Sequence, residues 1–501
     1  MSQQTDYLNI KTLGQLKKSR YQPKSIKEEI RQNLIKALNK KINVFEGIHG
    51  YKHTVLPQLY RALLSRHNIN LLGLRGQAKT RIARLMINLL DEYIPAIASS
   101  ELREDPLHPI TNLSKQLMEE AGDDLPITWI HRSERYFEKL ATPDVTVADL
   151  IGDVDPIKAA NLRLPYTDER VIHYGLIPRA HRSIFVINEL PDLQARIQVA
   201  LFNILEEGDV QIRGFQLRLP LDIQFVFTAN PEDYTQRGSI VTPLKDRIGS
   251  QILTHYPLDI SVSKRITAQE ARITEFQRAH ISVLPAAADL LEQIAVEARK
   301  SEYIDTKSGV SARLTISALE NLYSTCELRL IRTGEQHTFT RLVDFEGIIP
   351  AITGKVELLY EGEQEGAEIV AENLIGMAVK SILKNTQIPP VDKLKAIDET
   401  NPLNKILRWF SKGNELFLST EQTELEYRSE LEKVPGLLDY VTKHLPASTP
   451  AEERFFYAEI LLWSMAEHNK LNREAHIKGF IFSDLYSNFL KKTTDDFEAE
   501  S

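Results

Sequence analysis

The chain has 501 residues, 42% hydrophobic and 26% charged, an ordinary balance for a globular protein of several domains. Its net charge of -8 provides no overall attraction to nucleic acid or to an anionic membrane, and its single cysteine excludes an internal disulfide and a cysteine-rich metal site. The first residues lack the apolar core of a signal peptide, and no stretch approaches the ~20 apolar residues of a membrane span, so we expect a cytoplasmic protein.

Residues 1–44 are basic and contain a segment, 26–42, with the periodicity of an amphipathic helix. This pattern predicts a helix that buries one apolar stripe and solvates its charged face. An alternative is an arm that contacts an acidic partner or nucleic acid through its lysines and arginines. The stripe comprises Ile26, Ile30, Leu34, Ile35 and Leu38.

Residues 73–80 read GLRGQAKT, follow the apolar run 69–72 and precede a segment with helical spacing. A strand, a glycine-rich turn and a helix in this order are typical of a phosphate-binding loop, in which backbone N–H groups point at an anion. Lys79 is placed to reach the β- and γ-phosphates of ATP, and the Thr80 hydroxyl to ligate Mg²⁺. Ala78 departs from the usual glycine before the lysine, where backbone and phosphate approach closely.

Two later apolar runs, 183–189 (SIFVINE) and 224–230 (QFVFTAN), also read as strands that end in polar residues. Strand-like runs alternate with helical segments across residues 46–255. Such alternation predicts an α/β fold with a parallel sheet covered by helices.

The polar strand ends supply the groups that hydrolysis of a nucleotide requires. Glu189 is placed to orient and deprotonate a water molecule. Asn188 stands where an aspartate usually supports the metal shell, so one negative charge is missing there. Asn230 is placed to contact the γ-phosphate or the same water.

Two arginines follow the third strand. Arg247, directly after Asp246, would stabilise charge on a transferring phosphate if it reached a neighbouring subunit's nucleotide. Arg313 begins a helix within the mainly helical segment 256–335 and is placed to contact the γ-phosphate from a lid.

Four other patterns have simpler structural explanations. The string DISVS at 259–263 matches a metal-binding DxSxS sequence, but it enters the helical segment and we expect no metal there. His49 and His53 have i, i+4 spacing without a third ligand. The glutamates within 357–372 predict an exposed turn and a helix start, because closely spaced carboxylates repel. Cys326 fits a small apolar position in a helix.

The region 336–501 is predicted to be mainly helical. Thr449, Pro450 and Glu452 have the pattern of an N-cap, a first helical residue and the closing glutamate of a capping box. The helix that follows has an apolar face that is either core or a partner surface, formed by Phe455, Phe456, Ile460, Leu461 and Trp463.

In this order and spacing the motifs resemble those of the AAA+ ATPases, and within them the ATPase subunit of magnesium chelatase and its MoxR-type relatives. The resemblance covers roughly residues 44–330. The phrase PRAHRSIFVINE is especially close to that family's sequence around the Walker B strand. The segments that carry the resemblance are 73–80, 147–159, 175–190, 201–233 and 242–249.

The resemblance implies a P-loop αβα sandwich, the AAA+ core, at 45–255, followed by a helical lid at 256–335 and the additional region 336–501. The segment 206–222 would then be an inserted hairpin that turns near Gly214 and projects toward a ring pore. The resemblance further implies a homo-oligomeric ring, a hexamer, with ATP and Mg²⁺ at subunit interfaces. It implies work on a partner, by remodelling or metal insertion, together with a von Willebrand A-type protein.

Matched residue by residue, the resemblance also implies individual roles. Asn188 and Glu189 correspond to Walker B, with Asn188 and Thr80 on the metal side. Asn230 corresponds to sensor 1, Arg247 to the arginine finger and Arg313 to sensor 2. The nucleotide-binding Walker A residues are Gly73, Gly76, Gln77, Ala78, Lys79 and Thr80.

Three functions stay open at this stage. The first is a ring-forming ATPase, favoured by Glu189 and Arg247. The second is a nucleotide-gated assembly module with little hydrolysis, favoured by the departures at Ala78 and Asn188. The third is a DNA-linked ATPase of the transcription-activator type, supported only by the basic segment 1–44.

Overall fold

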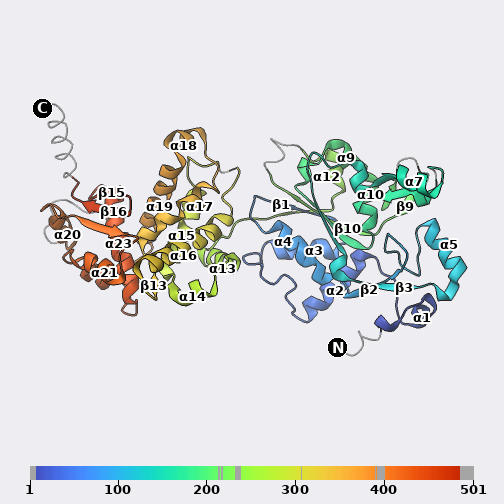
Figure 1. The fold of residues 1–501 in the computed structure, drawn as a ribbon, viewed down its shortest axis with the longest axis horizontal. Helices are drawn as coiled ribbons and strands as arrows, with labels where there is room; N and C mark the ends of the chain where they lie inside the picture. Colours follow the sequence, from blue (N-terminus) through green and yellow to red (C-terminus); the bar gives the residue numbers. More distant parts are fainter. Residues whose placement is uncertain are drawn as a thin grey trace. The chain divides into compact units, whose positions relative to one another are not determined.

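The computed structural model describes residues 7–166, 168–212, 215, 218–231, 239–305, 307–389, 391 and 401–485. The chain divides into two compact units, Met1–His255 and Tyr256–Ser501, and each is described by itself (Figure 1). No described helix combines the length and the apolar character that a membrane crossing requires.

The first unit alternates strands and helices along most of its length. Its helices are α1 (Leu13–Lys18), α2 (Ile26–Asn39), α3 (Val55–Leu64), α4 (Lys79–Leu85), α5 (Asn112–Ala121), α6 (Val147–Leu150), α7 (Pro156–Leu162), α8 (Leu176–Arg179), α9 (Ala195–Ala200), α10 (Phe202–Glu206) and α12 (Thr242–Arg247). Its strands are β1 (Ile69–Leu72), β2 (Tyr93–Ile97), β3 (Ile127–His131), β4 (Tyr136–Leu140), β5 (Gly152–Val154), β6 (Ile172–Tyr174), β7 (Ser183–Asn188), β8 (Asp209–Gln211), β9 (Arg218–Pro220), β10 (Ile223–Ala229) and β11 (Ser250–Leu253).

Five of these strands form one parallel sheet in the order β11-β1-β10-β7-β4. The register pairs Leu72 with Ala229 and Leu140 with Asn188, so these strands end at the same edge of the sheet. Strands β7 and β10 are buried along their whole length, as expected for a parallel sheet covered on both faces. The predicted α/β sandwich is therefore confirmed.

Alternate residues of β7 serve the two faces of this sheet. Ile184 and Val186 belong to the cluster that contains residues of α2, α3 and α4. Phe185 and Ile187 belong to the cluster that contains residues of α9, α10 and α12. Figure 1 shows these two groups of helices on opposite sides of β1 and β10. The arrangement is a three-layer αβα sandwich.

Helix α2 of the basic segment 1–44 is one of the helices that cover the sheet. Ile26, Ile30 and Leu34 are buried in the core cluster, whereas Leu38 is 42% exposed. Most of the apolar stripe predicted from the sequence is thus a core-facing surface, and the buried face of the helix also carries the charged residue Glu29.

The hairpin predicted within 206–222 corresponds to the antiparallel pair β8 and β9. Its predicted turn near Gly214 lies outside the described residues.

The second unit is mostly helical and also contains small sheets. Its helices are α13 (Ile260–Glu270), α14 (Glu275–His280), α15 (Pro285–Ala298), α16 (Arg313–Thr333), α17 (Ile349–Thr353), α18 (Tyr360–Glu365), α19 (Ala367–Lys384), α20 (Leu403–Phe410), α21 (Glu424–Glu432), α22 (Leu437–His444) and α23 (Ala451–Glu467). Its strands are β12 (Ile281–Ser282), β13 (Thr338–Phe339), β14 (Leu416–Ser419), β15 (Asn472–His476) and β16 (Gly479–Ser483).

One hydrophobic core runs through the described part of this unit, from Leu284 to Phe482. It crosses the boundary predicted between the lid and the C-terminal region at 335/336. Strands β14, β16 and β15 form an antiparallel sheet that the sequence analysis did not predict.

Helix α23 corrects one local prediction and decides another. It begins at Ala451 with Pro450 at the N-cap and no side-chain capping bond, so the predicted capping box is wrong. Phe456, Leu461 and Trp463 on this helix are buried in the core. Its apolar face is therefore core rather than a partner surface.

Cys326 lies on α16 and is fully buried, as predicted. Its thiol also donates a hydrogen bond to Asp344 Oδ2 at 3.4 Å, so the position is not purely apolar. Burial, reinforced by the neighbouring Asp344 carboxylate, raises the pKa of this thiol well above its ordinary value. The cysteine is thus a buried structural residue.

A buried ion pair fixes α2 to the sheet. Arg135, directly before β4, donates from Nη1 and Nη2 to the two carboxylate oxygens of Glu29, at 2.7 and 2.6 Å. The two side chains are only 1% and 5% exposed. Arg135 Nε donates to the carbonyl of Arg182 at 2.9 Å, and the Asp91 amide donates to Glu29 at 2.6 Å. Each charge is therefore balanced by hydrogen bonds inside the core.

We predict that Glu29→Ala strongly destabilises the first unit, because it leaves the Arg135 guanidinium buried without its carboxylate. Breaking a buried pair costs about 3–5 kcal/mol, which corresponds to more than roughly a hundredfold in the opening equilibrium. Amide hydrogen exchange of β4 and β7 measures this change in the full-length protein.

The matched control is Glu28→Ala, one residue away. Glu28 is partly exposed and pairs with Arg31 at 3.3 Å on the surface. In the Glu28→Ala variant, the amide exchange rates of β4 and β7 should stay close to those of the unaltered protein. Equal exchange rates in the two variants would show that the buried ion pair stabilises the first unit no more than the surface pair does.

Candidate nucleotide-binding site

The loop predicted to bind phosphate connects β1 to α4. Its backbone enters the left-handed region at Gly76 (φ 74°) and at Ala78 (φ 59°, ψ 17°). A side chain at Gly73 would collide with Thr254 and with the Gln77 side chain. The glycine pattern of the loop therefore reflects both backbone conformation and close packing.

The ammonium group of Lys79 occupies the inside of this loop. Its Nζ donates hydrogen bonds to the carbonyl oxygens of Gly73 and Leu74, the latter at 2.9 Å, and to Asn230 Oδ1 at 2.7 Å. Asn230 directly follows β10 and is 5% exposed. Two predicted site residues that lie far apart in sequence are thus in direct contact.

The next loop residue, Thr80, contacts the predicted Walker B strand. Its hydroxyl donates to Asn188 Oδ1 at 3.4 Å, and the Thr228 hydroxyl donates to the same oxygen at 3.0 Å. Asn188 ends β7 and is 8% exposed. The amide oxygen therefore faces the residue predicted to ligate Mg²⁺.

The other face of the Asn188 amide binds a carboxylate that the sequence analysis missed. Asn188 Nδ2 donates to Glu138 Oε1 at 2.7 Å, and Glu138 lies on β4, next to β7. Arg84 of α4 donates to both carboxylate oxygens at 2.9 and 3.1 Å, and the Tyr136 hydroxyl donates at 3.1 Å. Because a carboxylate only accepts hydrogen bonds, it fixes which end of the amide faces Thr80.

These contacts favour the charged form of Glu138. Burial tends to raise the pKa of this carboxyl, but the hydrogen bonds and charge of Arg84, with hydrogen bonds from Tyr136 and Asn188, outweigh it. The pKa therefore lies below its ordinary value, and the group is ionised at neutral pH.

Glu189 follows Asn188 in an unusual backbone conformation, with φ 56°. Its amide donates to the Thr228 hydroxyl at 3.1 Å. Non-glycine residues in this region cost of order 1–3 kcal/mol and cluster at functional sites. The Thr228 hydroxyl thus connects the backbone of Glu189 with the side chain of Asn188.

Behind the loop, Tyr51 and Thr254 tie it to the end of β11. The Tyr51 hydroxyl lies 3.0 Å from the Gln77 carbonyl and 2.8 Å from the His255 carbonyl. Thr254 Oγ1 donates to Gln77 Oε1 at 2.6 Å. The Gln77 side chain is therefore engaged in packing, and only its backbone is available to a ligand.

The two predicted arginines occupy different units. Arg247 ends α12 and its Nε donates to Glu206 Oε2 at 2.6 Å, while its guanidinium lies 5.2 Å from the centre of the Phe202 ring. Arg313 is exposed on the first turn of α16 in the second unit.

The oxygen ligands at the strand ends fit a magnesium ion. Thr80 would supply a hydroxyl and Asn188 an amide oxygen, and the Glu138 carboxylate stands behind the Asn188 amide; hard divalent cations prefer such oxygens. The Lys79 ammonium group now donates to the carbonyl oxygens of Gly73 and Leu74 and to Asn230. Phosphate oxygens of a bound nucleotide would take the place of these acceptors. The residues present therefore suit ATP with Mg²⁺.

Other candidate metal patterns gain no support. Asp259 of the DISVS string accepts the Ser261 amide at 2.7 Å, which makes it the N-cap of α13. Within the described ranges, no three histidine, cysteine or acidic side chains are grouped so as to hold a metal ion. Of the glutamates within 357–372, Glu357 precedes α18, Glu361, Glu363 and Glu365 lie on α18, and Glu368 lies in the first turn of α19. The predicted helix start is therefore present, and a short helix occupies part of the predicted turn.

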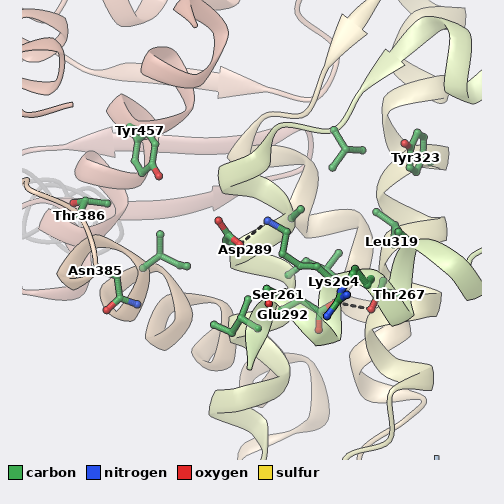
Figure 2. Close-up of a pocket in the computed structure, with 17 residues that line it drawn as sticks. Ser261, Lys264, Thr267, Asp289, Glu292, Leu319, Tyr323, Asn385, Thr386 and Tyr457 are labelled. Carbon is green, nitrogen blue, oxygen red and sulfur yellow. Dashed lines mark hydrogen bonds and ion pairs between the residues drawn. The ribbon is translucent and has the colours of Figure 1, made fainter. Parts of the chain in front are cut away.

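A cavity of about 800 Å³ lies within the second unit, lined by residues of α13, α15, α16 and α23 and by the end of α19 (Figure 2). Lys264 and Asp289 on its wall form an ion pair at 2.7 Å. Glu292 accepts hydrogen bonds from Ser263 and Thr267, and burial raises its pKa. Because these charges and polar groups already bind one another, the cavity lacks the phosphate-binding character of the loop in the first unit.

No protein-family model matches the chain. Among solved structures, it is similar to NtrX from Brucella abortus, at 13% identity over 80% of this chain and 72% of that chain, with a TM-score of 0.35. A Cytophaga hutchinsonii protein designated an ATPase matches at 15% identity over 70% of this chain and 95% of that chain, with a TM-score of 0.27. A chain from the complex between the magnesium chelatase subunits BchI and BchD matches at 18% identity over 68% and 94%, with a TM-score of 0.32.

All three TM-scores lie below 0.5, so the fold assignment rests on the chain itself. In the strand order β11-β1-β10-β7-β4, the glycine-rich loop follows β1, an inner strand of the parallel sheet. Strands β10 and β7 end at the same edge of the sheet as β1. The first unit thus has the αβα sandwich, with a glycine-rich loop after β1, that the resemblance to the AAA+ ATPases implied.

The left-handed backbone at position 78 yields a prediction. Ala78→Gly should keep ATP affinity within about twofold, because glycine adopts this conformation without strain. Ala78→Val should weaken ATP binding at least about tenfold, since a left-handed residue costs roughly 1–2 kcal/mol for alanine and more for a β-branched side chain. Calorimetry with ATP and Mg²⁺ measures both. Tight binding by the valine variant would show that the loop tolerates another conformation.

Proposed function

We propose that the protein is a ring-forming AAA+ ATPase that binds ATP with Mg²⁺ in the loop 73–80 and hydrolyses it to act on a partner. The observation that carries the proposal is the contact of Lys79 with Asn230, beside the contact of Thr80 with Asn188. These four side chains come from separate segments of the chain and meet where the phosphates and the metal would lie.

The proposed mechanism assigns a task to each residue. Lys79 would bind the β- and γ-phosphates. Thr80, with Asn188 behind it, would hold Mg²⁺, and that ion would supply positive charge against the phosphates. Glu189 orients the attacking water and accepts its proton. Asn230 would position that water or the γ-phosphate, and the sequence resemblance assigns Arg313 a contact with the γ-phosphate from the lid.

The ring is part of the proposal and draws on Arg247. In its own chain this arginine is held at a partly exposed site by Glu206 and Phe202. From such a site the arginine side chain could reach the nucleotide of a neighbouring subunit and act there as an arginine finger. A hexamer and a von Willebrand A-type partner follow from the sequence resemblance, as do remodelling or metal insertion as the work performed.

The second candidate is a nucleotide-gated assembly module with little hydrolysis. It is favoured by Asn188, whose side chain carries no charge. The DNA-linked alternative depended on the basic segment 1–44. Because α2 of that segment packs on the sheet through its apolar face, the segment has a structural role, and we do not favour this alternative.

We predict that Glu189→Gln lowers phosphate release by about 10²–10⁴-fold, because the amide cannot accept the proton of the attacking water. ATP binding should persist, whereas Lys79→Ala should abolish binding and hydrolysis together. Phosphate release and calorimetry on the same preparations separate these effects. Unchanged phosphate release in Glu189→Gln would exclude the enzyme and favour the assembly module.

We predict that Arg247→Ala retains ATP affinity and loses about 10³-fold in hydrolysis if it acts as an arginine finger. Mixing this variant with Lys79→Ala should restore activity, since the lysine-deficient subunits still present Arg247 to their neighbours. A mixture no more active than its parts would indicate that Arg247 acts within its own subunit.

A further inference from the structure

Asn188 departs from the aspartate expected at the end of the Walker B strand, and the contacts around it account for this departure. Its amide has two different ends, and each is bound to a different partner. The oxygen accepts from Thr80 and the nitrogen donates to Glu138. A carboxylate therefore lies directly behind the position that lacks one.

We propose that Glu138 supplies, through its hydrogen bond to Asn188, the negative charge that the magnesium site otherwise lacks. This inference rests on the nucleotide-binding function proposed above. Glu138 is a positioning residue in this role, because it acts on the metal site through the Asn188 amide. It aims the amide oxygen at Thr80 and makes that oxygen more electron-rich.

The placement of Glu138 follows from the fold. Strand β4 pairs with β7 in a parallel register that matches Glu138 with Val186 and Leu140 with Asn188. The Glu138 side chain is 22% exposed, so water screens its charge only in part. A charge at this depth influences a neighbouring cation more strongly than a surface carboxylate would.

Arg84 offers the competing explanation, in which Glu138 merely anchors α4. Its guanidinium binds both carboxylate oxygens, but its side chain is 64% exposed and reaches the pair from the solvent side. If anchoring were the role of Glu138, loss of Arg84 would have the same effect as loss of Glu138. If charge were the role, loss of Arg84 would leave the magnesium dependence unchanged or strengthen it, because a competing cation is removed.

The experiment measures the affinity of the full-length protein for a non-hydrolysable ATP analogue by calorimetry, once with Mg²⁺ and once with EDTA. The ratio of the two affinities reports the contribution of the metal and cancels effects on the nucleotide alone. Glu138→Gln should lower this ratio by about 10–100-fold, the usual effect of losing an outer partner of a metal ligand. Affinity in EDTA should stay the same or rise, because a negative charge near the phosphates is lost.

Two further variants discriminate between the explanations. Arg84→Gln should keep the ratio or increase it. The charge-swapped double variant Glu138→Gln/Asn188→Asp should restore the ratio to within about threefold of the unaltered protein, since the glutamine amide can donate to the new aspartate. This double variant also tests the proposal if the single glutamine variant fails to fold.

Three results would overturn the inference alone: an unchanged ratio in Glu138→Gln, an equal loss in Arg84→Gln, or no rescue by the double variant. Failure of the unaltered protein to bind the analogue would instead overturn the proposed function, and this inference with it.

Discussion

The parallel register of β4, β7, β10 and β1 is the constraint on which the candidate site depends. It brings the ends of these strands to one edge of the sheet, with Leu140 opposite Asn188 and Leu72 opposite Ala229. Residues distant in sequence thereby become neighbours without any long loop folding back across the sheet. A slip of one residue in β7 would turn Asn188 to the other face of the sheet and away from Thr80 and Glu138. Such a slip would also exchange the side chains of β7 between two closely packed layers, which opposes it.

Two residues of the site have a left-handed backbone that side chains rarely adopt, Ala78 and Glu189. Each stands at a junction where the chain leaves regular structure beside the predicted phosphate position. Both are held by neighbours outside their own segment: the Tyr51 hydroxyl contacts the Gln77 carbonyl, and the Thr228 hydroxyl binds the Glu189 amide. Strain at these points is therefore maintained by the surrounding fold, as is common where geometry serves binding or chemistry.

Elements with a strong local sequence pattern could be predicted from the sequence alone. The run 183–189 predicts a strand, which the structure shows as Ser183–Asn188, one residue shorter at its end. The predicted helix start at Arg313 agrees with the structure. Glu138 was missed because its five-residue strand, YFEKL, has weak periodicity, and its importance arises only through pairing with β7. Strand β14 escaped prediction for a similar reason, since it pairs with β16, which lies far away in the chain. Strands β15 and β16 form a local hairpin that the sequence analysis also missed. Long-range pairing is the information that local patterns lack.

The uncharged residue at 188 and the carboxylate at 138 are best understood together. An aspartate at 188 could not donate to Glu138, and two adjacent carboxylates would repel unless one took up a proton. An asparagine avoids this conflict, because its nitrogen satisfies Glu138 while its oxygen stays toward Thr80. The absence of a charge at 188 is thus a condition for keeping one at 138. The uncharged side chain of Asn188 is consequently a poor argument for an inactive site. The pair still carries one negative charge, which resides on Glu138, one hydrogen bond away from position 188.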